Sequence, residues 1–347
     1  LPIQIRVVNV IKMWIEEFHS DFDDATVSNI RDFFNFQVRE TRPALAATSL
    51  TLLEKFCARD GDQQEQYLSG ARSGSGSKVV EFSFSVDPPR PVVPKNIFSP
   101  NLTWEDVDDE ELARQLTLIE FEGFYKIRTS EFLHQSWSKA KYKHRAPHIL
   151  AVIRRFNAVS EWVATQIVLA SKLRHRVRIL TKLIGIADHL RQLQNYNTLM
   201  AFVAVFNSAA IHRLKHTFSE LAPKTAETLS DLRRLMRADD AYKNYRLQLD
   251  ESLPPCVPYL GLYLTELTHA EDASPNEIDG LINFAKCRHI HSIIAHINAH
   301  QQKGYNLQAV YQIQAFLRDP QPRLTDKAIF SHSSLIEPRG VDKAQLV

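Results

Sequence analysis

Cysteine and glycine are scarce in this sequence, and it has neither a long apolar run nor a large excess of one charge. The three cysteines, Cys57, Cys256 and Cys287, fit neither a disulfide framework nor a metal site, which favours a reducing, cytosolic environment. No segment approaches the ~18 apolar residues of a membrane span, and no signal-peptide pattern is found. A formal net charge of +2 argues against a nucleic-acid partner and against strong general attraction to anionic membranes.

Several motifs of catalytic classes are also missing. The sequence contains no Ser-His-Asp order, no HExxH zinc-protease motif, no phosphate-binding glycine loop and no kinase motif. We therefore expect no cofactor and no covalent chemistry.

Apolar residues recur at three- and four-residue steps through most of the chain, which predicts an all-α protein. The 347 residues are 44% hydrophobic and 24% charged, enough for one large domain and a smaller one. Because the chain starts at Leu1 within a helical pattern, we expect it to be a fragment of a longer protein.

Residues 1–57 contain three amphipathic stripes and predict a small helical unit. The stripes comprise Val8, Ile11, Ile15, Phe18 and Phe22; then Ile30, Phe33, Phe34 and Val38; then Leu50, Leu53 and Phe56.

Residues 58–100 predict a linker. Residues 69–77 consist almost entirely of glycine and serine, and residues 79–86 alternate as in a short strand or β-hairpin. The segment from Pro91 to Pro94 is interpreted as a stiff spacer rather than a PxxP ligand.

Residues 254–301 predict two helices joined by a short acidic turn. The first arm, about Tyr259 to Ala270, follows a proline, and the segment from Glu271 to Pro275 breaks it. The second arm is expected to bury eight apolar residues, namely Ile278, Leu281, Ile282, Ala285, Ile290, Ile293, Ile294 and Ile297. From periodicity alone, this hairpin is ordinary core.

The string PCVPYLGLYLTEL…LINFAK resembles the signature of the catalytic domain of Ras-type guanine-nucleotide exchange factors, the family that includes Son of Sevenless. Residues 112–137 (LARQLTLIEFEGFYKIRTSEFLHQSW) and 329–340 (IFSHSSLIEPRG) resemble further blocks of that domain. The opening IQIRVVNVIKMWIEEFHSDF resembles the later part of the family's N-terminal exchanger module. The resemblance implies a partial module over 1–57, a linker over 58–100 and a catalytic domain with a protruding helical hairpin over 101–347.

The resemblance also implies a partner and a mechanism. The partner is a small Ras-family GTPase, bound most tightly when nucleotide-free, and the hairpin displaces its switch 1 to release GDP. Asp272, with Glu271, would place negative charge where phosphate sits, while Thr268 and His269 would crowd the Mg²⁺ region beside Thr265. Two departures from the family bear on Mg²⁺ exclusion: no glycine follows the acids, and some members have a larger apolar residue at Thr268.

Eight further residues match positions that contact the GTPase in the family. Arg154 and Asn207 would order switch 2, and Tyr259 would hold a switch 2 tyrosine. The full set is Arg154, Asn207, His212, Asp240, Tyr242, Tyr259, His289 and His300. From chemistry alone, Asn207 could instead cap a helix, Arg154 could pair with a nearby acid, and both tyrosines could serve helix packing.

His289, His296 and His300 are expected on one face of the second arm, and the last two have an i, i+4 metal-binding spacing. A metal-dependent enzyme is disfavoured because no cysteine or carboxylate completes a ligand shell. The other alternative is a GTPase-binding scaffold without exchange activity. We expect a cytoplasmic protein that acts at the inner face of the plasma membrane, without inserting into it, recruited by regions outside this chain.

Overall fold

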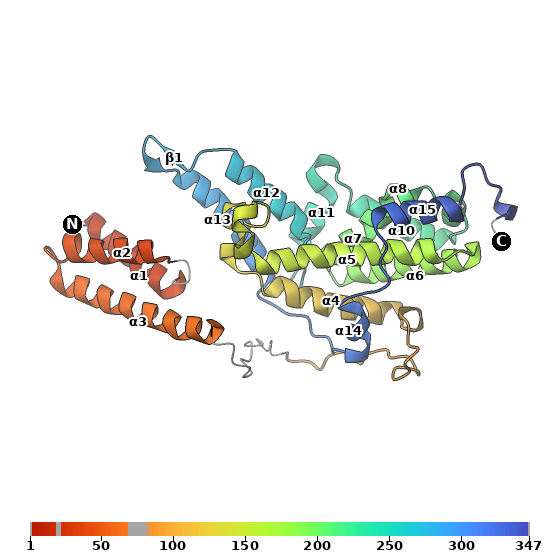
Figure 1. The fold of residues 1–347 in the computed structure, drawn as a ribbon, viewed down its shortest axis with the longest axis horizontal. Coiled ribbons are helices and arrows are strands. Elements are labelled where there is room, and N and C mark those ends of the chain that lie inside the picture. The colour runs from red at the N-terminus through yellow and green to blue at the C-terminus, as the bar shows by residue number, and fades with distance from the viewer. Residues whose placement is uncertain (1, 19–21, 69–81, 83, 346–347) are drawn as a thin grey trace. The chain divides into compact units, whose positions relative to one another are not determined.

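The computed structural model describes residues 2–18, 22–68, 82 and 84–345. The chain divides into two units, residues 1–81 and 82–347. Helices form nearly all the regular structure of both, so the predicted all-α class is confirmed (Figure 1). No helix in the described ranges is long and apolar enough to cross a membrane.

The first unit packs three helices and a π-helical turn around its own core. Its elements are α1 (Pro2–Phe18), α2 (Asp24–Asp32), the turn η2 (Phe33–Val38) and α3 (Pro43–Leu68). Apart from Ala46, the buried core comes from the predicted stripes, namely Val8, Ile15, Ile30, Phe34, Val38 and Leu53. The side chains of Phe18 and Phe56, also predicted in these stripes, lie outside the described part of the chain. Helix α3 continues beyond the expected limit at residue 57.

The second unit contains the predicted catalytic region. Its helices and 3₁₀ turns (η) are η3 (Trp104–Asp106), α4 (Asp109–Tyr125), η4 (Thr129–Gln135), η5 (Ala140–Arg145), α5 (Pro147–Leu169), α6 (Leu173–Gln192), α7 (Tyr196–Asn207), α8 (Ala209–His212), α9 (Lys215–Ser219), α10 (Pro223–Leu235), α11 (Asp239–Glu251), α12 (Leu260–Asp272), α13 (Phe284–His300), α14 (Tyr311–Leu317), α15 (Asp326–Ile336) and η6 (Lys343–Gln345). Two short antiparallel strands, β1 (Glu277–Ile278) and β2 (Leu281–Ile282), separate α12 from α13.

Local chemistry sets where these helices begin. The side chains of Asp108, Asn195 and Thr325 accept hydrogen bonds from backbone N–H groups in the first turns of α4, α7 and α15. Helices α5 and α10 begin instead with Pro147 and Pro223, whose fixed φ suits the first helical position.

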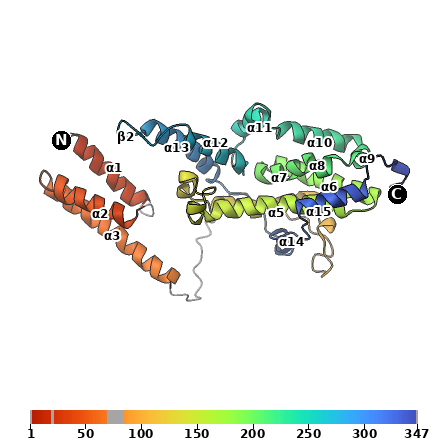
Figure 2. The ribbon, with the colours of Figure 1, turned by 45° about the horizontal axis from the view of Figure 1, so that its top comes forward.

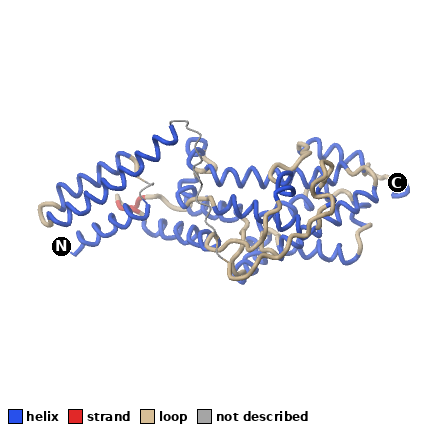
Figure 3. The backbone as a smooth tube through the Cα atoms, turned by 90° about the horizontal axis from the view of Figure 1, so that it is seen from below, coloured by secondary structure: helices blue, strands red, loops and turns tan. Residues whose placement is uncertain are grey.

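Four long helices, α4 to α7, form the centre of the second unit. Helix α4 packs against α6, α5 packs against α7, and α10 covers another side of α6 (Figures 1 and 2). Large side chains, including Phe124, Trp162, Phe202 and Phe206, are fully buried between them. The α12–α13 hairpin and the C-terminus lie at opposite ends of the unit (Figure 3). The hairpin therefore projects from a rigid helical body.

The segment before α4 differs from the expected strand. Residues 69–81 and 83, which include the glycine-serine run, lie outside the described residues, and residues 82 and 84–86 are not in a strand. Phe82 packs against Phe121 and Tyr125, with ring centroids 5.9 and 5.5 Å away. The backbone N–H of Val92 donates to Glu111 Oε2 at 2.9 Å. The proline-rich segment is thus attached to α4 at this point.

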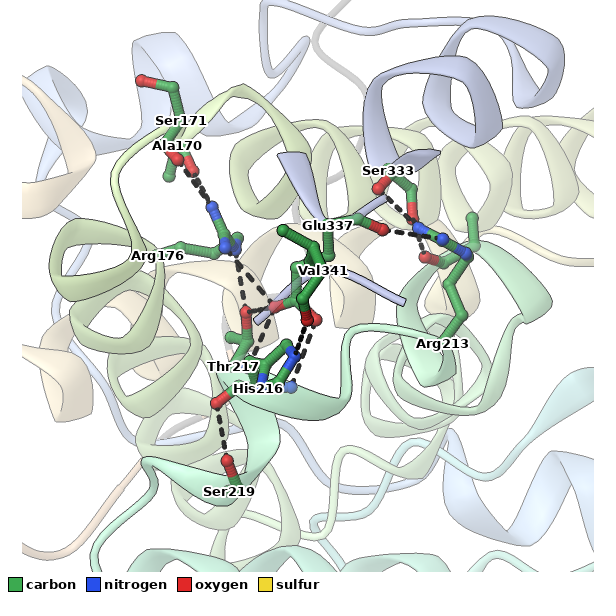
Figure 4. A network of polar contacts seen from close by, with 11 residues as sticks. Ala170, Ser171, Arg176, Arg213, His216, Thr217, Ser219, Ser333, Glu337 and Val341 are labelled. Atoms are coloured by element: carbon green, nitrogen blue, oxygen red, sulfur yellow. Dashed lines mark hydrogen bonds and ion pairs between the residues drawn. The ribbon is translucent and has the colours of Figure 1, made fainter. Parts of the chain in front are cut away.

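The C-terminal segment packs back onto the domain through a buried polar network (Figure 4). The carboxylate of Glu337 accepts hydrogen bonds from the backbone N–H groups of His216 and Thr217 at 3.1 and 2.9 Å. It also pairs with Arg176 at 3.4 Å, and Arg176 and Glu337 are only 0% and 3% exposed. Burial lowers the pKa of Arg176, and the Glu337 carboxylate opposes that shift. The network connects the chain end to α6 and α9.

Replacing Glu337 by Gln is expected to lower the free energy of unfolding by about 3–5 kcal/mol, because Arg176 would stay buried without its counter-charge. Chemical denaturation measures this change. The matched control is Glu122→Gln, which removes a carboxylate paired with Arg318 at the surface; its expected effect is below about 1 kcal/mol. Equal effects of the two variants would contradict the assignment of a buried ion pair.

Candidate functional site

The start of α12 is held by a buried carboxylate. The backbone N–H of Leu260 donates to Asn197 Oδ1 at 3.1 Å, and Asn197 Nδ2 donates to Glu120 Oε1 at 2.7 Å. Glu120, 2% exposed, also accepts a hydrogen bond from Arg155 Nε at 3.1 Å. Helices α4, α5 and α7 thus jointly determine where the first arm of the hairpin begins.

The segment before α12 is held by a second set of bonds. The backbone of Val257 accepts from the N–H of Tyr196 at 2.9 Å and donates to Gln194 O at 3.0 Å. The N–H of Tyr259 donates to the hydroxyl oxygen of Tyr245, which is fully buried, at 2.7 Å. The resemblance-bearing string at residues 256–260 therefore forms the rigid base of the hairpin.

An aromatic pocket opens beside this base. The ring of Tyr259 lies 5.9 Å from that of Tyr242 and 6.2 Å from that of Phe156, by their centroids. Burial, and then the neighbouring Tyr242, raise the pKa of Tyr259. The pocket measures ≈ 250 Å³ and is lined by Val152, Ile153, Phe156, Asn197, Tyr259, Leu260, Gly261 and Leu264. Its size and apolar lining suit one large side chain of a partner.

Three predicted docking residues have exposed side chains without partners among the described residues. Arg154 is exposed on α5, Asn207 is exposed at the end of α7, and His212 is exposed in α8. Within the described residues, none of these side chains forms a hydrogen bond or ion pair. The alternatives of an Asn207 cap and an Arg154 ion pair therefore do not occur in the described part of the chain.

The other two docking residues of this region lie on a left-handed turn. Asp240, Ala241 and Tyr242 have φ of 50°, 54° and 63°, values that cost free energy for residues other than glycine. Arg246 Nε donates to the carbonyl oxygen of Ala241 at 2.8 Å, and the same guanidinium pairs with Glu266 on α12. Arg246 thus connects this turn directly to the hairpin.

The predicted catalytic threonines lie on the outer side of α12. Thr265 is exposed and Thr268 is half-buried. Their hydroxyls donate to carbonyl oxygens of the same helix, of Gly261 at 2.9 Å and Leu264 at 2.8 Å. These threonines therefore offer bulk rather than unpaired donors.

Two predicted histidines come together across the hairpin. His269 of α12 and His289 of α13 are both exposed and line one groove of ≈ 700 Å³, together with Glu266. The two arms thus present both imidazoles on the same side of the hairpin.

The two acids predicted in the turn belong instead to the last helical turn of α12, which ends at Asp272. Asp272 is exposed and accepts from Gln135 Nε2 at 2.7 Å. Glu271 pairs with Lys286 at 3.2 Å and accepts from the backbone N–H of His134 at 3.3 Å. Acids at a helix C-terminus are unfavourable for the helix dipole. These contacts offset that cost and hold the carboxylates in place.

Sequence reasoning missed Lys286, the residue that organises the end of the hairpin. Although only 8% exposed, it donates from Nζ to the carbonyl oxygens of Glu271 and Ser274 at 2.6 and 2.8 Å and to Asn276 Oδ1 at 2.8 Å. Its position among the apolar residues of the second arm could have indicated that this lysine is buried. Gln135 was missed because its partner is 137 residues away in sequence.

The start of the second arm was predicted wrongly. Ile278, Leu281 and Ile282 lie in β1 and β2 and are 51%, 73% and 74% exposed, and α13 begins only at Phe284. Gly280, at φ +74°, supplies a turn that helix periodicity does not reveal. The apolar spacing of these residues therefore reflects a two-stranded tip, whereas the predicted burial of Ile290, Ile293, Ile294 and Ile297 is confirmed. Ala285 is exposed.

The three histidines predicted on one face of α13 do not share one environment. His289 and His296 are exposed, and His296 Nδ1 lies 2.9 Å from the hydroxyl of Tyr263. His300 is 5% exposed, and neither ring nitrogen has a hydrogen-bond partner among the described residues. We therefore leave His300 out of the docking surface proposed below. No group of three or more potential metal ligands occurs in the described ranges.

The sequence of residues 111–288 matches the RasGEF domain family, a match that covers about half of the chain. The chain belongs to the RasGEF family. It is 44% identical to Ras guanine nucleotide exchange factor A of Dictyostelium discoideum over 91% of the chain and 51% of that protein. It is 38% identical to Ras guanine nucleotide exchange factor J of the same organism, over 100% of the chain and 41% of that protein. It is also 38% identical to Ras guanine nucleotide exchange factor I, over 99% of the chain and 40% of that protein. The chain thus spans about half or less of the length of these curated relatives.

The RasGEF match begins in α4 and ends in α13. It contains the Glu120 carboxylate, the aromatic pocket and all of α12. Among the predicted site residues, only His289 and His300 lie beyond it. The residues that place the hairpin of this RasGEF domain therefore fall within the shared region.

The buried His300 ring predicts a pH-dependent stability. Burial, and then the nearby His296, lower the pKa of His300 to about 4. Because the unfolded chain takes up this proton near pH 6.5 and the folded chain only near 4, the free energy of unfolding falls as pH falls through that window. His300→Phe should remove on the order of 1–2 kcal/mol of the loss between about pH 7 and pH 5. Chemical denaturation at both pH values measures the difference, and identical losses in the two proteins would refute a neutral buried ring.

Proposed function

We propose that this RasGEF chain is a guanine-nucleotide exchange factor that promotes GDP release from a small Ras-family GTPase. The observation that carries the proposal is the RasGEF match, which covers the first arm of the hairpin, α12, and this arm is held by hydrogen bonds at both of its ends. The names of the relatives support the same activity.

Docking of switch 2 uses the surface around the aromatic pocket. A tyrosine of the GTPase enters beside Tyr259 and Tyr242. The apolar surface there, and a backbone whose hydrogen bonds are already made, favour burial of an aromatic ring. The exposed guanidinium of Arg154 binds carboxylate or carbonyl oxygens in a fork, and Asn207 both donates and accepts. Asp240 and His212 extend this contact.

Release follows from linkage. A protein that binds the empty GTPase more tightly than the loaded one weakens nucleotide binding by the same factor. The α12 arm supplies that difference by displacing switch 1. Asp272 brings negative charge to the phosphate site, while Thr268 and His269 occupy space near Mg²⁺, whose bonds to phosphate hold the nucleotide. His289 contacts the GTPase from the other arm.

The rival function is a GTPase-binding scaffold of the same fold. It is favoured by the absence of glycine after Asp272 and by the small Thr268 side chain. Both features reduce the bulk available to exclude Mg²⁺.

The decisive assay measures release of a fluorescent GDP analogue from Ras, Rap and Ral proteins with catalytic amounts of this chain. Acceleration with one GTPase establishes the activity and identifies the partner class. Binding to a nucleotide-free GTPase without acceleration would support the scaffold.

We further propose that the exchange reaction occurs at the inner plasma membrane, reached through regions outside this chain.

Two variants separate docking from release. Arg154→Glu should raise the GTPase concentration needed for half-maximal exchange by about tenfold, through loss of a charge-assisted contact. Asp272→Ala should instead lower the maximal rate by about tenfold with a smaller effect on that concentration, because its charge acts on bound phosphate. Titration of the exchange rate with GTPase measures both quantities.

The control for Asp272→Ala is Gln135→Ala, which removes the same 2.7 Å hydrogen bond and keeps the carboxylate. If both variants lose the same rate, Asp272 acts by holding the hairpin. If Arg154→Glu and Asp272→Ala exchange like the unaltered chain, the assigned interface is wrong.

A further inference from the structure

A dense group of positive charges lies in the turn between η4 and α5, drawn in yellow at the left end of α5 in Figures 1 and 2. We define the basic ledge as Lys139, Lys141, Lys143 and Arg145. These four cations occupy alternate positions of a seven-residue stretch without an acid, in a chain whose net charge is only +2. All four are exposed, and none forms an ion pair with the described residues. The ledge is thus a concentrated, unneutralised charge.

An aromatic ring organises part of the ledge. Lys141 Nζ lies 5.4 Å and Arg145 Cζ lies 5.2 Å from the ring centroid of Tyr142. Such cation–π contacts restrain the two side chains without neutralising them.

The ledge opens into a pocket shared with the hairpin. The pocket measures ≈ 450 Å³ and is lined by His134, Lys139, Lys141, Tyr142, Arg145, Glu271 and Asn276. Its one carboxylate, Glu271, is already paired with Lys286 at 3.2 Å. The pocket therefore retains an excess of positive charge.

The ledge is continuous with the proposed docking surface. It directly precedes α5, and Arg154 lies seven residues into that helix, or about 10 Å along the axis. On its other side it borders the end of α12 through Glu271. A GTPase that contacts both Arg154 and the hairpin end would lie over the ledge.

We propose that the basic ledge binds an acidic segment of the GTPase and accelerates its association with this chain. This inference rests on the proposed exchange function. An anionic membrane is the poorer fit because the neighbouring hairpin tip exposes two acids, Glu277 and Asp279, which such a surface would repel. Exposed charges of this kind act mainly on the association rate, and salt screens them.

The test neutralises the ledge with Lys139→Ser, Lys141→Ser, Lys143→Ser and Arg145→Ser together. Stopped-flow association with the nucleotide-free form of the responding GTPase should slow by about tenfold at low salt. The difference should nearly disappear at about 0.5 M salt, where the Debye length is a few ångströms. The maximal exchange rate should change by less than about twofold, since these charges lie outside the hairpin.

The matched control removes the same charge at the far end of α5, with Lys172→Ser, Arg174→Ser, Lys215→Ser and Lys224→Ser. These cations are exposed and form no ion pair with the described residues. At about 0.1 M salt their loss should change association by less than about twofold, because Lys172 and Arg174 follow the far end of α5, roughly 30 Å from the ledge, whereas the Debye length is then about 10 Å. If the fourfold ledge variant does not fold, the pairs Lys139→Ser with Lys141→Ser and Lys143→Ser with Arg145→Ser provide the same comparison.

Three outcomes would overturn the inference. Equal slowing by ledge and control variants would indicate a general charge effect. Unchanged association, with sedimentation on phosphatidylserine vesicles lost only in the ledge variant, would assign the ledge to a membrane. If the unaltered chain neither binds a nucleotide-free GTPase nor accelerates GDP release, the proposed function itself fails and the inference falls with it.

Discussion

The carboxylate of Glu120 is the group on which the placement of the hairpin depends. It is buried on α4, where an uncompensated charge would be very costly. Arg155 supplies the counter-charge and Asn197 a further hydrogen bond, so three helices meet at one point. Asn197 then accepts the first free N–H of α12, from Leu260. The direction of the projecting arm is therefore set by the core of the domain.

The far end of the same arm is held in a different way. There the acids at the helix C-terminus oppose the dipole, and Lys286 and Gln135 compensate for them. Between the two ends, the outward side of α12 carries Thr265 and His269 in exposed positions. A helix restrained at both ends and free along one side can press against a partner without yielding. That property fits the proposed displacement of switch 1 by α12.

The surface next to the hairpin combines apolar and charged contacts. The Tyr259 pocket offers apolar area close to the unpaired Arg154, while Arg246 connects the Tyr242 turn to α12. Rim charges affect how fast and how selectively a partner arrives, and buried aromatic contacts affect how long it stays. In the proposed function, the basic ledge would raise the association rate of the GTPase, and the pocket would lengthen the lifetime of the complex.

Much of the fold follows from local patterns. Helical periodicity identified the stripes of the first unit and the buried face of α13 at Ile290 and Ile297, because burial of an amphipathic face requires that spacing. The same reasoning failed at Ile278 and Leu281, where a glycine turn and a two-stranded tip produce similar spacing in exposed residues. The family resemblance placed His300 at a GTPase contact, whereas packing of α13 buries its side chain.

The amino-acid sequence by itself determined the all-α class, the family and the position of the hairpin along the chain, because these depend on spacing between near neighbours and on motif strings. Tertiary structure alone decided which polar groups hold the hairpin. Glu120 with Asn197, and Gln135 with Asp272, are separated by 77 and 137 residues. No local pattern encodes such pairs, since each bond forms only after the helices have packed and excluded water from one partner or both.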